Sequence, residues 1–495
     1  MSDRASSENY DAVVIGAGIG GLACGAALSK GGKRVRVIEQ HASPGGYCVC
    51  FNRKGFKFSA GVLRINGCEP GGIIYEFLSD LGLRDEVEFY RLDPLMRVVF
   101  PGESFAFPFK DMPLYIAKLL EKFPEEKRGI TQLLDTMKAL FAEKVSSPGP
   151  ALQKYRDKTF KELLDEYVTN AKLKSFISFL SLTDAAVSPS RGSAIFCSRL
   201  IMAHFTEGGF WPKGGPQTLA DALAKGLLKF GGKLEFRTRV TKIITEDGKA
   251  VGVETEDGRR IKASYVISNA AARQSYFDLV GEDKLKPDFV AKLKQMEVGP
   301  SIFEVYLGVD LDPRTVGITD FELDVFETFD LDKGFDIICE GGLPPFLSPL
   351  VVSTPTLLDP SIAPENKHIV TLLAYAPYHL KGKDWKEEKA RVTEAIISKA
   401  EKVIPGLSQH IVVKDSATPL TMERYTLNTD GSIVGWANTP GGFWDKPPRE
   451  SPIENLYLTG HWTRPGGGVS SVLLSGMKVA QSLLKGYEGL RLSWD

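Results

Sequence analysis

The sequence predicts an α/β protein in which a parallel sheet with crossover helices is joined to a second region of mixed sheet and helices (α+β). Three observations favour this class. An apolar strand near the N-terminus runs into a glycine-rich turn and a helix, and a strand, a glycine triplet and a helix follow one another again near the C-terminus. Between these two segments, stretches with helical periodicity alternate with separate apolar strands.

Composition and charge describe an ordinary globular chain. Its 495 residues suit two or three domains. The 61 basic and 62 acidic side chains leave a net charge of -1, which gives no reason to expect nucleic acid as a partner. The N-terminus lacks the basic and apolar regions of a secretory signal, and no apolar run reaches the length of a membrane span. We therefore expect a cytoplasmic protein.

The six cysteines show neither metal-ligand spacing nor a disulfide framework, so we expect no metal site. Val49 alone separates Cys48 from Cys50, which suggests the alternating faces of a strand rather than a redox pair.

The N-terminal segment carries a dinucleotide-binding signature. Its elements are expected at residues 12–15 (strand), 22–30 (helix) and 34–38 (strand). Gly16 makes the tight turn, Gly18 lets the backbone approach a pyrophosphate, and Gly21 lets the helix pack closely on the strand. Glu39 ends the second strand, where a carboxylate accepts hydrogen bonds from a ribose 2′-OH. The pattern predicts a Rossmann-like unit that binds FAD or NAD.

A second glycine pair decides between these two dinucleotides. Gly45 and Gly46 follow Glu39 closely, where an NAD-binding unit enters its crossover helix, and Gly61 comes after alternating strand residues. This pattern resembles the flavoproteins of the amine oxidase and phytoene desaturase superfamily, in which the stretch lies along the FAD diphosphate and ribityl chain and reaches the isoalloxazine ring. The resemblance therefore implies FAD.

The middle of the chain is less specific. Amphipathic helical stretches dominate residues 69–206, and one of them, residues 159–182, begins with Thr159 and Glu162 in capping-box spacing. Farther on, a helix is expected at residues 218–230, hairpin turns at 247–248 and 257–258, a strand end at 268–269, apolar strands at 301–311 and 368–378, a helix at 387–403, and an irregular buried connection in the proline-rich run 341–360.

The C-terminal stretch "NLYLTGHWTRPGGGVSSVLLSGMKVAQSLL" predicts a strand at residues 456–459, a glycine triplet at 466–468 and a helix from about Val469. Together with "GAGIGG", "SPGGY", "FWPKGGPQTLADAL" and "PLTMERYTLNTDGSIVGW", it resembles bacterial phytoene desaturases, carotenoid isomerases and retinol saturase over nearly the full length. In that family the first and last segments lie together around one FAD. The positive end of the last helix then points toward the flavin ring, where negative charge gathers on reduction.

The resemblance implies a Rossmann-like FAD-binding domain and a discontinuous substrate domain. The expected segments are 1–68, 207–294 and 414–495 for FAD binding, 69–206 for a helical cap or first part of the substrate domain, and 295–413 for its second part. The expected cofactor-binding residues are Gly16, Gly18, Ile19, Gly20, Gly21, Glu39, Gln40, Gly45, Gly46, Tyr47, Gly61, Val62, Val240, Asn269, Gly460, His461, Gly467, Gly468 and Val469.

Three positions depart from the family pattern. Tyr47 stands where many relatives carry arginine, Ser59 where an acidic residue is common, and His461 where an aspartate usually follows the glycine. No residue is assigned as catalytic; His461, Tyr47 and Glu207 are candidates by residue type alone.

The function that this resemblance implies is that of an FAD-dependent oxidoreductase, with carbon-carbon single or double bonds of a long apolar polyene or isoprenoid lipid as its target. The alternatives are a redox-neutral cis-trans carotenoid isomerase that uses reduced FAD, a flavin amine oxidase, and a non-enzymatic lipid-binding flavoprotein. A quinone, dioxygen or another diffusible carrier is the expected electron partner, with a peripheral contact at the inner face of the membrane. Desaturation, saturation and isomerisation all stay open, as do the lipid and the oligomeric state.

Overall fold

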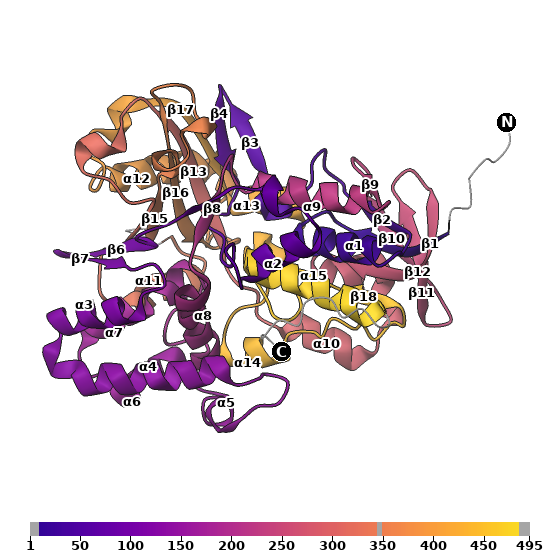
Figure 1. The fold of residues 1–495 in the computed structure, drawn as a ribbon, viewed down its shortest axis with the longest axis horizontal. Helices are drawn as coiled ribbons and strands as arrows, with labels where there is room; N and C mark the ends of the chain where they lie inside the picture. Colours follow the sequence, from indigo (N-terminus) through magenta and orange to yellow (C-terminus); the bar gives the residue numbers. More distant parts are fainter. Residues whose placement is uncertain (1–8, 344–348, 485–495) are drawn as a thin grey trace.

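The computed structural model describes residues 9–343 and 349–484, which are organised by two seven-stranded sheets. In Figure 1 the first sheet lies to the right with helices α1, α9 and α15, the second lies at the upper left with α12, and a group of helices lies below the second sheet. Among the described residues, none of the helices has the length and apolar character needed to cross a bilayer.

The first sheet contains the first and the last strand of the described chain. Its strand order is β10-β11-β12-β1-β2-β9, and β18 pairs with β12. The bounds are β1 Tyr10–Ile15, β2 Val35–Ile38, β9 Lys233–Glu235, β10 Val240–Glu246, β11 Lys249–Thr255, β12 Arg260–Ser268 and β18 Leu456–Leu458. The expected Rossmann-like α/β arrangement is confirmed, including the two hairpin turns on either side of β11.

Three parallel strands of this sheet bring distant segments together. β1 pairs with β12, and β12 pairs with β18, all in parallel. The carboxyl ends of parallel strands meet at one edge of a sheet. The loops that begin at Gly16, Asn269 and Thr459 therefore lie side by side, although hundreds of residues separate them in sequence.

Helices α1 (Ile19–Lys30), α9 (Gln217–Lys229) and α15 (Val469–Leu483) pack beside this sheet. The approach of α1 to α15 depends on glycine, because a Cβ atom on Gly476 would lie 2.1 Å from the carbonyl oxygen of Gly20. The structure confirms the helices expected near these positions, with α1 beginning three residues before the expected Leu22.

The second sheet has the strand order β17-β13-β16-β15-β14-β6-β7. The bounds are β6 Met96–Phe100, β7 Glu103–Phe107, β13 Ser301–Val309, β14 Glu322–Val325, β15 Leu350–Ser353, β16 His368–Ala376 and β17 Ile411–Ala417. Helices α11 (Leu331–Cys339), α12 (Trp385–Ala400) and α13 (Pro419–Thr426) belong to the same half, and α12 packs on β13, β15 and β16.

Residues 69–206 contain most of the helices below the second sheet in Figure 1. They are α3 Met112–Lys122, α4 Lys127–Ala142, α5 Pro150–Lys154, α6 Phe160–Tyr167, α7 Ala171–Thr183 and α8 Ala194–Glu207, whereas α2 Ile73–Asp80 lies beside α15. The capping box of Thr159 and Glu162 is confirmed at the start of α6. The stretch 159–182 forms two helices rather than one, because Asn170 caps a new helix with its side chain.

Other short elements complete the chain. They are β3 Cys50–Arg53 paired with β4 Phe56–Ser59, β5 Phe89–Arg91 paired with β8 Phe210–Pro212, α10 Pro287–Gln295 and α14 Pro440–Asp445.

Two local expectations were wrong. Cys48 ends a 3-10 turn (Gly46–Cys48) and only Cys50 lies in β3, so the two thiols do not share a strand. Both are free, and burial raises the pKa of each. The proline-rich run 341–360 is not irregular throughout, because β15 lies within it; residues 344–348 of that run are outside the described residues.

Candidate functional site

A cavity of about 390 Å³ lies at the edge where β1, β12 and β18 end. One part of its wall comes from the glycine-rich loops of the first sheet, and the other part comes from the second sheet and from helices α7 and α8. The apolar part of that second wall includes Phe196, Leu200, Val351 and Leu373, and Leu63 of the segment after β4 adds to it. The cavity therefore connects a dinucleotide-type loop with an apolar chamber.

Nearly all of the expected cofactor-binding residues line this one cavity. They are Gly16, Gly18, Ile19, Gly20, Glu39, Gln40, Gly45, Gly46, Tyr47, Gly61, Val62, Val240, Asn269, Gly460, His461, Gly467, Gly468 and Val469. Gly21 lies outside the lining, and its place is explained by packing, since a Cβ atom there would lie 2.2 Å from the Gly16 carbonyl oxygen. Ser59 and the candidate Glu207 also lie outside the lining.

The side chain of Asn269 joins the first and last glycine loops. A Cβ atom on Gly18 would lie 2.7 Å from Asn269 Nδ2, and one on Gly460 would lie 2.8 Å from Asn269 Oδ1. A side chain at either glycine would displace the Asn269 amide, and Gly460 also has a φ of 91°, which favours glycine. The backbone stays accessible from the cavity at the N-terminus of α1, where N–H groups and the helix dipole favour an anionic ligand.

Glu39 is fixed by backbone donors at the end of β2. Its side chain accepts a hydrogen bond from Ala17 N–H at 2.8 Å and another from His41 N–H at 2.9 Å. The residue is buried and lines the cavity. The carboxylate thus occupies the end of the second strand, as the dinucleotide signature requires.

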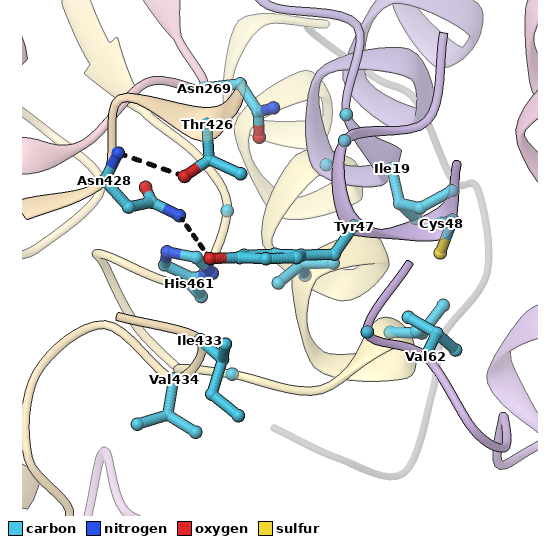
Figure 2. Close-up of a pocket in the computed structure, with 18 of the residues that line it drawn as sticks. Ile19, Tyr47, Cys48, Val62, Asn269, Thr426, Asn428, Ile433, Val434 and His461 are labelled. Atoms are coloured by element: carbon cyan, nitrogen blue, oxygen red, sulfur yellow. Dashed lines mark hydrogen bonds between the residues drawn. The ribbon is translucent and has the colours of Figure 1, made fainter. Parts of the chain in front are cut away.

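Aromatic side chains gather in the middle of the cavity (Figure 2). The Tyr47 hydroxyl donates to the Ser432 carbonyl oxygen at 3.0 Å and accepts from Asn428 Nδ2 at 3.3 Å. The ring of His461 lies 6.1 Å from the Tyr47 ring and 5.4 Å from the Trp462 ring, measured between centroids. Burial raises the pKa of Tyr47 to about 12, so its hydroxyl stays protonated.

His461 offers a nitrogen atom without a partner. Its Nε2 atom is buried and has no hydrogen bond within the described residues. Burial, and then the nearby Lys446 ammonium, lower the pKa of His461 to about 4. A neutral imidazole that lines a cavity and has an unsatisfied nitrogen fits a ligand hydroxyl or an ordered water there.

A buried cation supports the C-terminal glycine loop. Lys446 is 1% exposed, and its Nζ atom donates to Asn438 Oδ1 at 3.1 Å and to the Pro465 carbonyl oxygen at 3.4 Å. None of the ion pairs formed by the described part of the chain includes Lys446. Burial, and then Arg464, lower its pKa to about 8. Lys446 is not part of the cavity lining, but it contacts Asn438, which is, so its ammonium places positive charge behind the wall of the cavity.

An ionic cluster that the sequence did not predict lies in the wall beneath the second sheet. Arg64 pairs with Asp184 through Nη2 and with Glu322 through Nη1. His204 Nε2 lies 2.7 Å from Asp184 Oδ2, and Asn66 Nδ2 lies 3.1 Å from His204 Nδ1. Because the Asn66 amide donates to Nδ1, the proton of a neutral His204 is on Nε2 and is donated to Asp184.

Burial and pairing give the acids of this cluster different protonation states. Burial alone would raise the pKa of Asp184, but Arg64 and His204 hold that pKa below its usual range. Burial raises the pKa of Glu322 against the opposing effect of Arg64, and it raises the pKa of Asp324 well above the ordinary value. The cluster can therefore hold protons as well as an ionised Asp184.

The residues of the cluster come from separate segments, which explains why the sequence did not reveal them. Arg64 follows β4, Asp184 directly follows α7, His204 lies on α8 and Glu322 begins β14. The only available signal was the presence of single charged residues in apolar surroundings, as in "FLSLTDAAV" around Asp184. Among the described residues, no group of His, Cys, Asp and Glu side chains has the arrangement of a metal site.

The two-sheet architecture and the glycine-rich cavity define the class of protein, a flavoprotein with a Rossmann-like FAD domain and a substrate domain. The chain belongs to the family of flavin containing amine oxidoreductases, whose model matches residues 19–484. FAD is accordingly its cofactor.

Curated relatives match along most of the chain. The chloroplastic prolycopene isomerase of Daucus carota is 30% identical, over 96% of this chain and 80% of the relative. The lycopene-forming phytoene desaturase of Pantoea ananas is 29% identical, over 95% and 98%. The all-trans-retinol 13,14-reductase of Macaca fascicularis is 26% identical, over 92% and 82%.

The fold also matches solved structures. An oxidoreductase from Methanosarcina mazei superposes with a TM-score of 0.70 at 22% identity, over 96% of this chain and 100% of the other. At that identity the likeness concerns the fold alone.

Proposed function

We propose that this chain is an FAD-dependent enzyme that changes carbon-carbon bonds of a long apolar polyene or isoprenoid lipid. The observation that carries the proposal is the single cavity that joins the glycine-rich loops to an apolar chamber between the two sheets. Three relatives named for reactions of prolycopene, phytoene and retinol support the same substrate class.

The residues of the first sheet hold the cofactor in this proposal. The N-terminus of α1 and Gly18 receive the diphosphate, Glu39 accepts hydrogen bonds from the adenosine ribose, and Val240 borders the adenine. His461 faces the ribityl region with its neutral imidazole, and the loop Gly466 to Gly468 with α15 supports the flavin ring. When bound, FAD supplies hydride exchange at N5.

The rest of the wall acts on the substrate. Leu63, Phe196, Leu200 and Leu373 exclude water and fit an apolar chain, which offers few polar handles for orientation. Asp184 is held ionised by Arg64, and Glu322 keeps a proton more readily than an ordinary carboxyl group. These side chains give the chamber a place to hold or release one proton beside the substrate.

A redox-neutral cis-trans isomerase that uses reduced FAD is the second candidate. The observation in its favour is the 30% identity to a prolycopene isomerase along 96% of the chain. Both candidates use the same cavity and differ in whether the flavin ends the reaction in a changed redox state.

The proposed electron partner is a quinone, dioxygen or another diffusible carrier. We also propose that the enzyme meets its lipid through peripheral contact with the inner face of a membrane. The exposed large apolar side chains of the described residues are Leu114, Leu228, Val412 and Tyr425, and they lie on four different elements. Flotation with liposomes tests this contact, and a protein that stays at the bottom with every lipid composition contradicts it.

Lipid extracts of cells with and without the protein test the proposed function. We expect a polyene or isoprenoid whose number or geometry of double bonds differs between the two extracts. The matched control is Gly18→Val, in which a Cβ atom would lie 2.7 Å from Asn269 Nδ2 and block the dinucleotide loop. A lipid difference that persists in Gly18→Val, or the absence of any difference with the intact protein, would contradict the proposal.

A further inference from the structure

The ionic cluster in the cavity wall is costly for a substrate that is a hydrocarbon along its whole length. Asp184 lines the cavity and keeps 16% of its side chain exposed, whereas the Arg64 side chain is 7% exposed. A hydrocarbon that covers these groups removes their water and offers no hydrogen bond in return. Such unpaired burial costs about 1 to 3 kcal/mol for a neutral polar group and more for a charged one.

Both kinds of hydrogen-bonding capacity remain on this wall. The carboxylate of Asp184 has about four acceptor positions, and Arg64 and His204 each contact one of its oxygens. The guanidinium of Arg64 has about five N–H donors, and it donates from Nη1 to Glu322 and from Nη2 to Asp184. Glu322, which is 1% exposed and also lines the cavity, has an Oε2 atom without a hydrogen-bond partner.

The neighbouring charges select the kind of ligand group that fits. A carboxylate would pair with Arg64 but would be repelled by Asp184, and a carbonyl group could only accept from Arg64. An ammonium would be attracted by Asp184 but repelled by the guanidinium of Arg64, which already pairs with that carboxylate. A hydroxyl group both donates and accepts, so it alone among these groups uses the two sides of the pair.

We propose that the chamber takes a polyene or isoprenoid alcohol, whose hydroxyl group donates to Asp184 and accepts from Arg64. This inference rests on the proposed function, which concerns the carbon-carbon bonds, and adds a recognition site for one polar end of the substrate. Asp184 and Arg64 are specificity-determining residues in this account, with His204 and Glu322 holding them in position.

The site predicts a marked preference for alcohols over their apolar analogues. A pocket built to hydrogen-bond a hydroxyl group rejects the analogue that lacks it more strongly than an apolar pocket rejects an added methylene. We expect the FAD-loaded protein to bind a saturated C20 isoprenoid alcohol at least about tenfold more tightly than its methyl ether or the parent alkane, a difference of about 1.4 kcal/mol. The three ligands are compared in one detergent, through the perturbation of the flavin absorbance.

Two isosteric variants and one matched control identify the residues. Asp184→Asn and Glu322→Gln keep the shape of the cluster, and both should reduce the preference for the alcohol to about threefold or less. The first variant removes the ionic acceptor. The second weakens the contact that holds Arg64 in position. Asp415→Asn makes the same chemical change in an ion pair with Arg53 outside the cavity lining, and it should leave the preference intact. FAD content and the thermal melting temperature show that each variant is folded.

Equal binding of the alcohol, ether and alkane by the intact protein would overturn the inference, and so would an unchanged preference in Asp184→Asn. If the protein showed no preference for the alcohol but still converted a polyene hydrocarbon, the proposed function would remain supported. The reverse result, a preference for the alcohol without conversion of any polyene, would count against the proposed function alone.

Discussion

His461 shows how burial decides the state of a single side chain. A protonated imidazole near the cofactor would attract its phosphates, but the pKa of about 4 leaves this residue neutral at pH 6 and at pH 8. Its free Nε2 atom then acts only as a hydrogen-bonding group. We propose that the histidine, which replaces the aspartate of the family, donates or accepts one hydrogen bond to the ligand without adding negative charge beside the phosphates.

His461→Ala should weaken the binding of FAD by about 1 to 3 kcal/mol, the cost of removing one buried hydrogen-bond partner. The loss should be the same at pH 6 and pH 8, because the group is neutral at both values. His461→Asp should largely restore the affinity. Titration of the apo-protein with FAD measures the effect, and equal affinity of the original protein and His461→Ala would show that the imidazole has no contact with the cofactor.

Lys446 carries a second prediction at this scale. Lys446→Met removes the charge while filling similar space beneath the glycine loop. Because the ammonium has no carboxylate partner in the described part of the chain, its loss should favour oxidised over reduced flavin and lower the midpoint potential of the bound cofactor. Lys213→Met, at an exposed ion pair with Glu88, is the control. A potential equal to that of the control would exclude an electrostatic role for Lys446.

At the scale of elements, the contact between α1 and α15 unites the two ends of the chain. Gly476→Ala would place a Cβ atom 2.1 Å from the Gly20 carbonyl oxygen, so the helices would have to separate. We expect a loss of about 1 to 3 kcal/mol in the free energy of unfolding, together with a lower FAD content. Gly441→Ala, on α14, is a control with space for the methyl group. Equal stability of the two variants in urea unfolding would show that this close packing is unimportant.

The first sheet could be predicted from the sequence because its signals are local. Glycine turns, capping residues and hairpin dipeptides mark β1, α1, β12 and α15 without reference to the rest of the fold. The strands β5, β6 and β7 lie in a stretch expected to be helical, and they were missed because each is only three to five residues long. Residues 96–107 become strands through packing that the sequence does not show.

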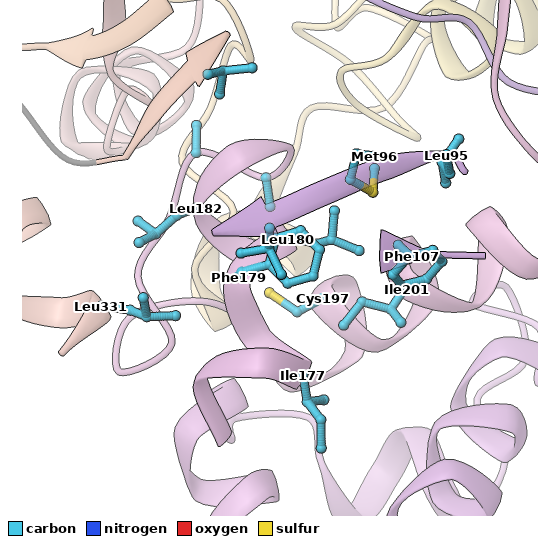
Figure 3. Packing of buried hydrophobic residues seen from close by; sticks show 14 of the residues in the cluster. Leu95, Met96, Phe107, Ile177, Phe179, Leu180, Leu182, Cys197, Ile201 and Leu331 are labelled. Atoms are coloured by element: carbon cyan, nitrogen blue, oxygen red, sulfur yellow. The ribbon is translucent and has the colours of Figure 1, made fainter. Parts of the chain in front are cut away.

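Figure 3 shows this packing. Met96 of β6 and Phe107 of β7 lie close to Phe179 and Leu180 of α7 and to Ile201 of α8. Their apolar faces therefore depend on helices far along the chain.

The candidate site also has one part that could be predicted from the sequence and one part that could not. The cofactor loops have local sequence signatures, whereas the partners of Asp184 come from α8 and from the segment after β4, and no spacing rule connects them.

At the scale of the whole molecule, one sheet edge receives the loops of the first, middle and last segments, so the described chain has a place for one dinucleotide. No cysteine occurs between residues 455 and 484, and we expect the flavin to be bound without a covalent link. Acid precipitation should release one FAD per chain into the supernatant. A yellow pellet with a colourless supernatant would reveal a covalent attachment.

The central claim is that the flavin and the apolar chamber together change carbon-carbon bonds. The most direct test is an anaerobic incubation of the FAD-loaded protein with a polyene, once with oxidised and once with reduced flavin, followed by chromatography and mass measurement of the polyene. We expect a product with two hydrogen atoms fewer or more, formed in proportion to the flavin that changes redox state, or a geometric isomer formed with reduced flavin. A polyene unchanged in both incubations, together with reduction of the flavin by a primary or secondary amine, would contradict the account.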